Sequence, residues 1–344
     1  MPTQPAPARL PLLLTMGDPA GIGPAITLTA WLARRERGLS PFLVLGDPDL
    51  YRARARQLNL QVPVTQSGDL AELNEKFDHA LCVLPLPLAA PARPGKPDTR
   101  NAETVIASIK RAVDLIHAGR GGALITNPIS KQVLYEAGFP YPGHTEYLGA
   151  LAQAHGERAE PVMMLHCPQL RVVPATVHIP LRQVPTSLTR ERIETVVRVT
   201  ADALAARFGV SHPRIAVTGL NPHAGEEGAL GEEEQRVIAP AIAALREAGY
   251  TITGPWPADT IFQERLRDSY DCVIAMYHDQ ALIPIKTLAF DHAVNITLGL
   301  PFLRTSPDHG TAFDIAGSGK ASPSSLIEAL RVAAQAAQGE RVGA

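Results

Sequence analysis

The sequence predicts an α/β protein in which helices cover both faces of a sheet. Short apolar runs alternate with amphipathic stretches along nearly all of the 344 residues, and this repeated β-then-α order is typical of the class. Apolar residues make up 45% of the chain, which is enough for a large core. Many of the 31 prolines follow strand-like runs, where an α/β protein has its loops. A chain of this length exceeds one ordinary domain, so we expect two lobes.

The expected elements follow from local patterns in chain order. Short apolar runs indicate buried strands, and longer amphipathic stretches that end near a glycine, such as 99–118 before Gly119, indicate helices. The predicted strands are 10–15, 42–45, 81–84, 123–126, 162–166, 171–177, 214–218, 272–276 and 293–298. The predicted helices are 24–37, 50–58, 99–118, 189–208, 232–248 and 324–337, with a further helix opening at Gly143.

Charge, hydropathy and cysteine content exclude several classes of protein. The net charge of −2 leaves no basic excess for binding nucleic acid. No apolar run approaches the roughly 20 residues that span a bilayer. Residues 1–11 lack the features of a signal peptide, so we expect a flexible tail on a cytoplasmic protein without a membrane partner. Three cysteines cannot form a disulfide framework, and Cys82 and Cys272 are interpreted as buried thiols.

Two glycine-rich segments fall short of nucleotide-binding motifs. The segment 17–24 follows the first strand, but Ile26 stands where the dinucleotide motif needs glycine or alanine, so a tight turn and a phosphate loop both remain open. Near Lys320 the phosphate-loop motif is broken by Asp314 and Ala321. Neither a Rossmann nor a P-loop nucleotide site is predicted.

Three histidines stand at strand ends, where ligands of α/β proteins gather. His178 and His278 directly follow apolar strands, and His223 lies a few residues beyond another. Three imidazoles with one open position describe a catalytic divalent-metal site, although spacings of 45 and 55 residues match no local metal motif and separate surface roles remain the alternative. Asp279 and Asp259 could orient an imidazole or bind the metal, or be solvated loop acids.

Lysine is rare, and three of the six lysines, Lys131, Lys286 and Lys320, are predicted in loops after strands. Because lysine can exchange a proton and arginine cannot, Lys286, eight residues after His278, is the best placed for chemistry.

Two further segments suit an anion. His144 and Thr145 stand at a helix start, which favours a phosphate or carboxylate, with capping by Thr145 as the alternative. Asn295 and Arg304 lie within or after one late strand, and Arg304 either grips an anion or lies at the surface.

Taken together, these segments resemble the 4-hydroxythreonine-4-phosphate dehydrogenase family of pyridoxal phosphate synthesis. One departure is Ala25, where the family usually has glutamate. The matching segments are 16–26, 126–131, 143–148, 177–181, 219–228, 277–287 and 295–317.

The resemblance implies a fold similar to isocitrate and isopropylmalate dehydrogenases, with two intertwined α/β/α lobes and a cleft between them. We expect a flexible tail over 1–11, a first lobe over 12–133 plus 310–344, and a second lobe over 134–309 that carries the metal and substrate loops. It also implies a homodimer with its metal site at the subunit interface.

The resemblance further assigns roles to residues. His178, His223 and His278 would bind the metal, drawn from both chains, and His144, Thr145, Lys286, Asn295 and Arg304 would hold the substrate. Lys286, Asp279 or Asp259 would act as the base. The segment 308–317 is similar to the adenosine loop of isopropylmalate dehydrogenases, so His309, Gly310, Thr311, Ala312, Asp314 and Ile315 would bind the cofactor, with Asp314 favouring NAD over NADP.

The implied reaction is a metal-dependent oxidation of 4-phosphooxy-L-threonine at C3 with NAD or NADP. The metal would be zinc, magnesium, cobalt or manganese. The product, 2-amino-3-oxo-4-phosphooxybutanoate, is a β-keto acid that loses carbon dioxide to give 3-amino-2-oxopropyl phosphate. Two other activities remain open: a phosphothreonate or phosphoerythronate dehydrogenase of sugar-acid breakdown, and a metallohydrolase that uses the same histidines on water. A binding module without catalysis is the least favoured.

Overall fold

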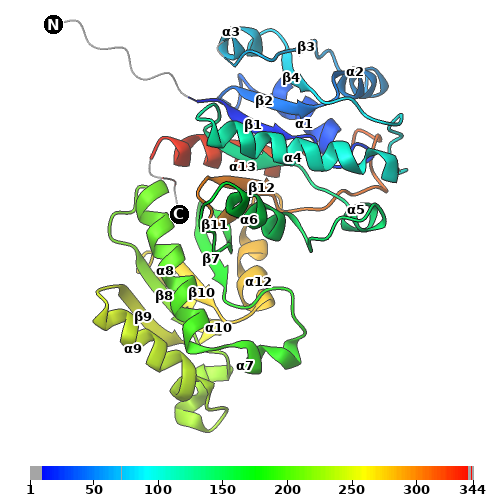
Figure 1. Ribbon diagram of the computed structural model, residues 1–344. Helices are drawn as coiled ribbons and strands as arrows, with labels where there is room; N and C mark the ends of the chain where they lie inside the picture. The colour runs from blue at the N-terminus through cyan, green and yellow to red at the C-terminus, as the bar shows by residue number, and fades with distance from the viewer. Residues whose placement is uncertain (1–9, 71, 340–341, 343–344) are drawn as a thin grey trace, which may run out of the picture. The chain divides into compact units, whose positions relative to one another are not determined.

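The computed structural model describes residues 10–70, 72–339 and 342 (Figure 1). These residues form two compact units, the first over 10–157 and 302–334 and the second over 158–301, 335–339 and Val342. Of the tail expected over 1–11, only Leu10 and Pro11 fall within the described residues. In the part of the chain that the structure describes, no helix is both long and apolar enough to cross a membrane.

The first unit contains a parallel sheet with the strand order β3-β4-β2-β1-β5-β12. Its strands are β1 (Leu12–Thr15), β2 (Phe42–Gly46), β3 (Val64–Gln66), β4 (Leu81–Pro85), β5 (Ala123–Thr126) and β12 (Arg304–Pro307). Its helices are α1 (Gly23–Leu32), α2 (Pro48–Gln57), α3 (Leu73–Phe77), η1 (Thr99–Asn101), α4 (Ala102–His117), α5 (Lys131–Glu136), α6 (His144–Ala154) and most of α13 (Ser324–Ala337).

The second unit contains a mixed sheet with the strand order β11-β6-β7-β10-β8-β9. The strands β7, β10, β8 and β9 are parallel neighbours, whereas β6 runs antiparallel to both β7 and β11. Its strands are β6 (Val162–Cys167), β7 (Leu170–Pro174), β8 (Arg214–Thr218), β9 (Thr251–Trp256), β10 (Cys272–Ala275) and β11 (Val294–Leu298). Its helical segments are η2 (Leu181–Gln183), α7 (Val184–Ser187), α8 (Arg190–Arg207), η3 (Pro222–Gly228), η4 (Glu234–Ile238), α9 (Ala239–Glu247), α10 (Ala258–Ile261), α11 (Glu264–Arg267) and α12 (His278–Ala289).

The sequence patterns explain why these elements form. Every residue of β1, β2 and β5 is buried, as expected for central parallel strands whose two faces are both covered. Helix α4 buries Val105, Ile109 and Val113, which recur every four residues and so lie on one face. Helix α8 begins after Thr189, whose side chain accepts a hydrogen bond from the backbone of Arg192 and caps the helix.

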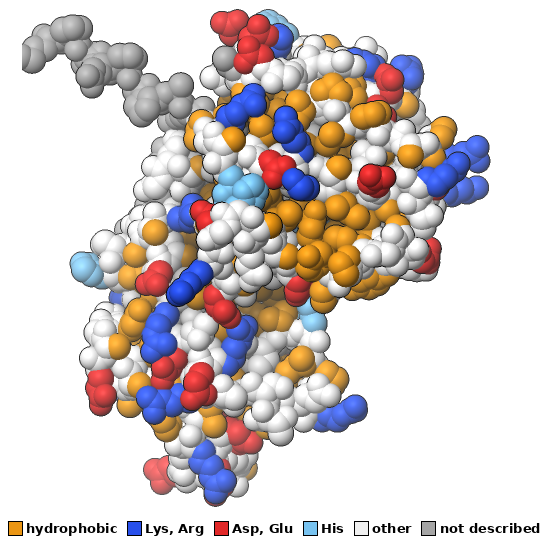
Figure 2. Space-filling view, viewed as in Figure 1, with side chains coloured by type: hydrophobic (Ala, Val, Ile, Leu, Met, Phe, Trp, Pro, Cys, Tyr) orange, Lys and Arg blue, Asp and Glu red, His pale blue; other side chains and the backbone are white. Residues whose placement is uncertain are grey.

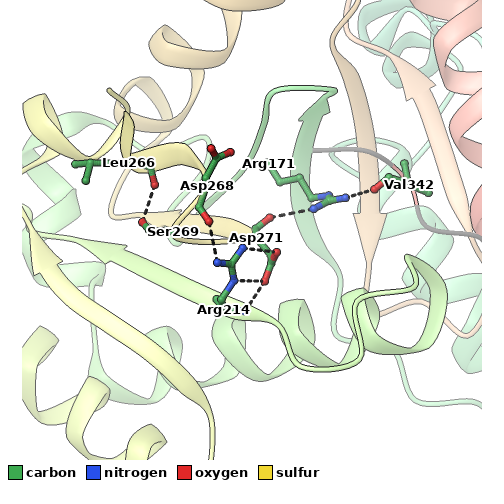
Figure 3. A network of polar contacts seen from close by, with 7 residues as sticks. All are labelled: Arg171, Arg214, Leu266, Asp268, Ser269, Asp271 and Val342. Carbon is green, nitrogen blue, oxygen red and sulfur yellow. Dashed lines mark hydrogen bonds and ion pairs between the residues drawn. The ribbon is translucent and has the colours of Figure 1, made fainter. Parts of the chain in front are cut away.

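A polar network joins the starts of the parallel strands in the second unit (Figure 3). The guanidinium of Arg214, at the start of β8, donates to both carboxylate oxygens of Asp271, which precedes β10. Arg171 in β7 donates to the backbone carbonyls of Asp271 and Val342. These contacts hold the amino-terminal ends of β7, β8 and β10 together. The opposite, carboxyl ends of the same strands lead into the loops that carry the candidate site residues.

Helix α12 differs from the sequence prediction, which placed Lys286 in a loop. Pro284 lies inside the helix, a position that normally interrupts one. The helix forms nevertheless because Ala281, Ile285 and Ala289, four residues apart, are buried in the core beside β6, β7 and β10. Burial of this face overrides the local preference of proline.

The two units also divide the chain differently from the expected lobes of 12–133 plus 310–344 and 134–309. The segments 134–157 and 302–309 pack within the first unit. His155 at the end of α6 contacts Asp114 of α4, and Arg304 in β12 contacts Thr126 of β5.

The surface is mixed in charge. On the face shown in Figure 2, basic and acidic side chains are interspersed among apolar ones, in keeping with a net charge of −2. The α/β class predicted from the sequence is confirmed.

Candidate active site

His178 and His278 meet at the carboxyl ends of two neighbouring parallel strands. The register pairs Ile274 of β10 with Val173 of β7, and Thr176 continues the pairing beyond the strands by bonding to the carbonyl of Met276. His178 follows β7 and His278 begins α12 after β10. Their rings consequently lie side by side, with centroids 5.7 Å apart and planes inclined by 46°.

The two imidazoles open into a cavity of about 250 Å³ within the second unit. Nδ1 of His278 lies 2.6 Å from Oδ1 of Asp279, so the carboxylate orients the ring and leaves Nε2 for another partner. The cavity is lined by Val177, His178, Ile179, Leu181, Val184, Tyr277, His278 and Asp279.

His223 and Asp259 follow the next two strands of the same parallel set, β8 and β9. His223 lies in η3 with a side chain that is 65% exposed, and its Nδ1 is 3.9 Å from Glu226. Asp259 is exposed in α10, which packs against η3, and accepts a hydrogen bond from the hydroxyl of Thr260. Buried Gln280 links the two regions, because it bonds to Thr218 at the end of β8 and to the backbone of Met276 after β10.

The segment that carries His223 has an unusual backbone. Five consecutive residues, 223–227, have positive φ angles between 43° and 82°, and only Gly225 among them is glycine. A left-handed conformation costs an ordinary residue about 1–2 kcal/mol, and such strain persists only where the surrounding structure imposes it.

The side chains of this region meet the needs of a divalent metal in part. Two adjacent imidazoles, one of them oriented by a carboxylate, fit two positions of a zinc-type site. Among the described residues of this single chain, no three histidine, cysteine or acidic side chains converge on one point. The structure therefore brings His178 and His278 together but does not add His223 to the pair.

Lys286 and Asn295 are also in the second unit. Lys286 is in the third turn of α12, and its Nζ is 5.6 Å from the ring centroid of Phe290. Asn295 is half-buried in β11, opposite Leu165 of β6.

In the first unit, cationic and neutral donors gather around the start of α6. Arg304 is buried in β12 and donates to the hydroxyl of Thr126 through Nε at 3.1 Å and a terminal nitrogen at 2.6 Å. Burial lowers the pKa of Arg304 to about 10, so the group stays charged at neutral pH. A Cβ at Gly143 would lie 3.7 Å from the Nζ of Lys131, which places this exposed lysine beside His144.

His144 is held in its neutral form. Burial, together with the charges of Arg304 and Lys131, lowers the pKa of His144 well below its usual 6.5. Its Nε2 is buried without a hydrogen-bond partner in the described chain. The N-cap of α6 is Gly143, where no side chain caps the helix, so Thr145 at its second residue is not the cap. Two cations, a neutral imidazole and a helix amino terminus form a surface suited to an anion.

The sequence predicts Lys131 in a loop after a strand and favours Lys286 over it as a candidate, without placing Lys131 in the substrate set. Lys131 is the first residue of α5, and the turn over 137–143 brings it back to Gly143. Lys131 and Gly143 are twelve residues apart, and the chain reverses between them. No sequence motif predicts that they lie close together.

The predicted cofactor segment packs on the glycine-rich segment of the first unit. The backbone amide of Ile22 donates to the carbonyl of Thr311, and a Cβ at Gly21 would lie 2.9 Å from the same oxygen. Buried Arg54 donates to the carbonyls of Pro19 and Gly21. The glycine-rich segment is thus a tight turn that packs against the segment 308–317.

The side chains of the predicted cofactor segment are partly or fully exposed to solvent. Asp314 is exposed, and Ala312 has a φ of +42°. His309 contacts the carbonyl of Gly310 through Nδ1, at 3.1 Å. Ile315 bonds through its backbone to Ala312, which folds the segment into a turn.

Comparison with known proteins places the chain in a family. A family model described as pyridoxal phosphate biosynthetic protein PdxA matches residues 38–333. The chain belongs to the PdxA family. The family that the sequence motifs resembled is therefore confirmed.

Relatives support the PdxA assignment over nearly the whole chain. A 4-hydroxythreonine-4-phosphate dehydrogenase of Xanthobacter autotrophicus is 54% identical, over 97% of this chain and 95% of the relative. One from Methylorubrum populi is 56% identical, over 95% of each chain. The crystal structure of the enzyme so named from Klebsiella pneumoniae has a TM-score of 0.86 at 41% identity, covering 96% of this chain and all of that one.

Proposed function

We propose that this chain oxidises 4-hydroxythreonine 4-phosphate, the substrate for which its relatives are named, and that the oxidation takes place at C3 with a nicotinamide cofactor. The 2-amino-3-oxo acid formed then loses carbon dioxide to give 3-amino-2-oxopropyl phosphate. The observation that carries the proposal is the convergence of Arg304, Lys131 and His144 on one anion-binding surface, in a chain of this family.

The substrate would be held through its anionic groups. Arg304 and Lys131 supply charge, and neutral His144 supplies a hydrogen bond from Nε2, which has no partner among the described residues. Thr145 adds a hydroxyl at the open start of α6. Lys286 and Asn295 are the other residues of the proposed substrate set.

The proposed metal ligands are His178, His278 and His223. A divalent cation such as zinc, cobalt, manganese or magnesium would acidify the substrate hydroxyl, in the same way that a bound metal ion lowers the pKa of a water ligand to about 7. Because Asp279 is engaged with His278, its part is to orient that imidazole. Lys286 is then the favoured base for the hydroxyl proton, with Asp259 as the alternative.

The cofactor would bind at the segment 308–317, through His309, Gly310, Thr311, Ala312, Asp314 and Ile315. The exposed carboxylate of Asp314 would accept hydrogen bonds from ribose hydroxyls and repel a 2′-phosphate. NAD is therefore the proposed cofactor rather than NADP.

A homodimer would complete the metal site. Leu181, which lines the cavity beside the histidine pair, is 67% exposed, and Ile283 in α12 and Phe290 just after that helix are 65% and 73% exposed. Exposed apolar patches mark interfaces, and a second copy of the chain would cover these side chains and supply His223 to the metal site. The three cysteines are free and buried, as is usual in the reducing cytoplasm where we propose that the protein works.

The test follows the absorbance of reduced nicotinamide. Purified protein loaded with one divalent metal is mixed with NAD and, in parallel, with 4-hydroxythreonine 4-phosphate, 4-phosphothreonate or 4-phosphoerythronate. We expect kcat/KM to be highest for the first substrate. Higher values for either sugar acid would reassign the protein to sugar-acid breakdown, and no reduced nicotinamide with any of the three would overturn the proposal.

A further inference from the structure

We propose that Glu234 is a positioning residue that holds His223 in place to bind the metal. This inference rests on the proposed function, because it takes His223 as a metal ligand. Glu234 lies eleven residues beyond His223, at the first position of the π-helical segment η4, and its side chain is almost fully buried.

The carboxylate of Glu234 binds the backbone just before His223. Oε1 accepts hydrogen bonds from the amides of Leu220, at 2.7 Å, and Asn221, at 2.8 Å. Oε2 accepts one from the side-chain amide of Asn221, at 3.0 Å. Three donors on one carboxylate form a strong, directional anchor for the entry to η3.

The turn that carries His223 is wrapped closely around the same carboxylate. A Cβ at Gly219 would lie 2.9 Å from Oε1, and a Cβ at Gly225 would lie 2.5 Å from Oε2. The two glycines therefore let the backbone approach on both sides of Glu234. The left-handed run over 223–227 includes Gly225 and precedes the π-helical turn, which is itself a feature common at functional sites.

The imidazole of His223 is exposed, so its position depends on the backbone beneath it. That backbone adopts an unfavourable conformation at four non-glycine positions. An anchor is required to hold it, and the buried carboxylate of Glu234 is bonded to the residues that immediately precede the run. Loss of the anchor would let the turn relax and move the imidazole away from the metal.

Replacement of Glu234 by glutamine tests this with little change of volume. One amide oxygen could still face the two backbone donors, but without the negative charge. The new amide nitrogen would then face the side-chain nitrogen of Asn221, which is also a donor. We therefore expect the turn to loosen while the buried core around β8 and α9 stays packed.

The experiment titrates metal-free protein with Co²⁺ and follows its visible absorption, which reports the number and geometry of the ligands. Glu234→Gln should bind Co²⁺ about 10- to 100-fold more weakly than the wild type, the range found for residues that support a metal ligand. Its spectrum should resemble that of His223→Ala. Glu232→Gln is the matched control, since Glu232 is exposed and pairs only with Arg236 among the contacts described.

A general structural role would not produce this pattern. Circular dichroism of Glu234→Gln should match the wild type, as should inorganic phosphate binding by the first unit. If Glu234→Gln does not fold, Gly225→Ala replaces it, because the added Cβ disturbs the same contact from the turn. Wild-type Co²⁺ affinity and spectrum in the folded variant would overturn the inference.

The role of His223 and the role of Glu234 can be rejected separately. If His223→Ala keeps wild-type metal binding, His223 is not a ligand and the metal part of the proposed function falls. If His223→Ala loses metal while folded Glu234→Gln keeps it, the proposed function stands and only the role of Glu234 is rejected.

Discussion

The side chains of His278 and Asp279, adjacent in sequence, are joined by a contact of 2.6 Å between Nδ1 and Oδ1. His278 begins α12 and faces His178, which follows the neighbouring strand. A carboxylate on one ring nitrogen fixes the tautomer that offers the other nitrogen to a metal. This geometry is the one that the proposed metal site requires of a ligand and its orienting partner.

Replacement of Asp279 by asparagine should weaken metal binding about 10- to 100-fold, because the imidazole loses its charged partner. The affinity is measured by titrating metal-free protein with Zn²⁺ against a competing chelator. Asp291→Asn is the control, since that exposed carboxylate lies beyond the end of the same helix. Equal affinity in Asp279→Asn and the wild type would show that the carboxylate does not support the ligand.

The anion-binding surface leads to a second prediction. Lys131→Gln should raise the KM for the phosphorylated substrate roughly tenfold, the lower end of what a hydrogen bond to a charged group contributes, because Lys131 is exposed. The value of kcat should change much less. Lys110→Gln, which removes an exposed lysine paired with Asp114 on α4, should leave both constants unchanged. An unaltered KM in Lys131→Gln would remove this residue from the substrate site.

Much of the fold follows from the sequence because burial there is periodic. The apolar runs of β1, β5 and β10 are fully buried, as their composition predicts. Strand β9 was missed because Gly254 and Pro255 interrupt its pattern, and it lies at the edge of the second sheet, where proline is tolerated. Helix α12 was missed because Pro284 signals a break that tertiary packing overrides.

The candidate site likewise has parts that the sequence predicts and parts that it does not. Positions directly after strands, such as His178 and His278, can be predicted to lie near one another once a parallel sheet is assumed. The proximity of Lys131 to Gly143 depends on how a turn reverses, and the anchoring of the His223 turn by Glu234 depends on a π-helical start. Neither has a periodic signal in the sequence.

The packing of Gly21 against Thr311, in the proposed cofactor segment, leads to a third prediction. Gly21→Ala would place a Cβ 2.9 Å from the carbonyl oxygen of Thr311, which is tighter than real contacts allow, so the segment 308–317 must shift. We expect the KM for NAD to rise several-fold. Gly68→Ala is the control, because no atom lies within 4 Å of its added Cβ. An unchanged KM for NAD in a folded Gly21→Ala protein would separate this segment from the cofactor.

Buried His166 in β6 makes a fourth prediction, on the pH dependence of stability. Burial, with a smaller effect of Arg171, lowers the pKa of His166 to about 3, from a usual 6.5. Below pH 6.5 the unfolded chain binds a proton that the folded protein does not bind. The free energy of unfolding should therefore fall as the pH drops from 6.5 toward 3, by about 1.4 kcal/mol per pH unit from this group.

The test compares urea unfolding of the wild type and His166→Gln between pH 4.5 and 7.5. Glutamine stays polar but does not titrate, so the variant should show a shallower loss of stability in acid, with little difference in slope above pH 6.5. His144 also contributes to the loss of stability in acid, because its pKa is lowered as well. In His166→Gln the dependence of the unfolding free energy on pH should therefore become weaker but not disappear. His212→Gln, at an exposed loop position, should keep the wild-type slope. Parallel curves for wild type and His166→Gln would show that His166 is protonated in the folded protein as easily as in the unfolded chain.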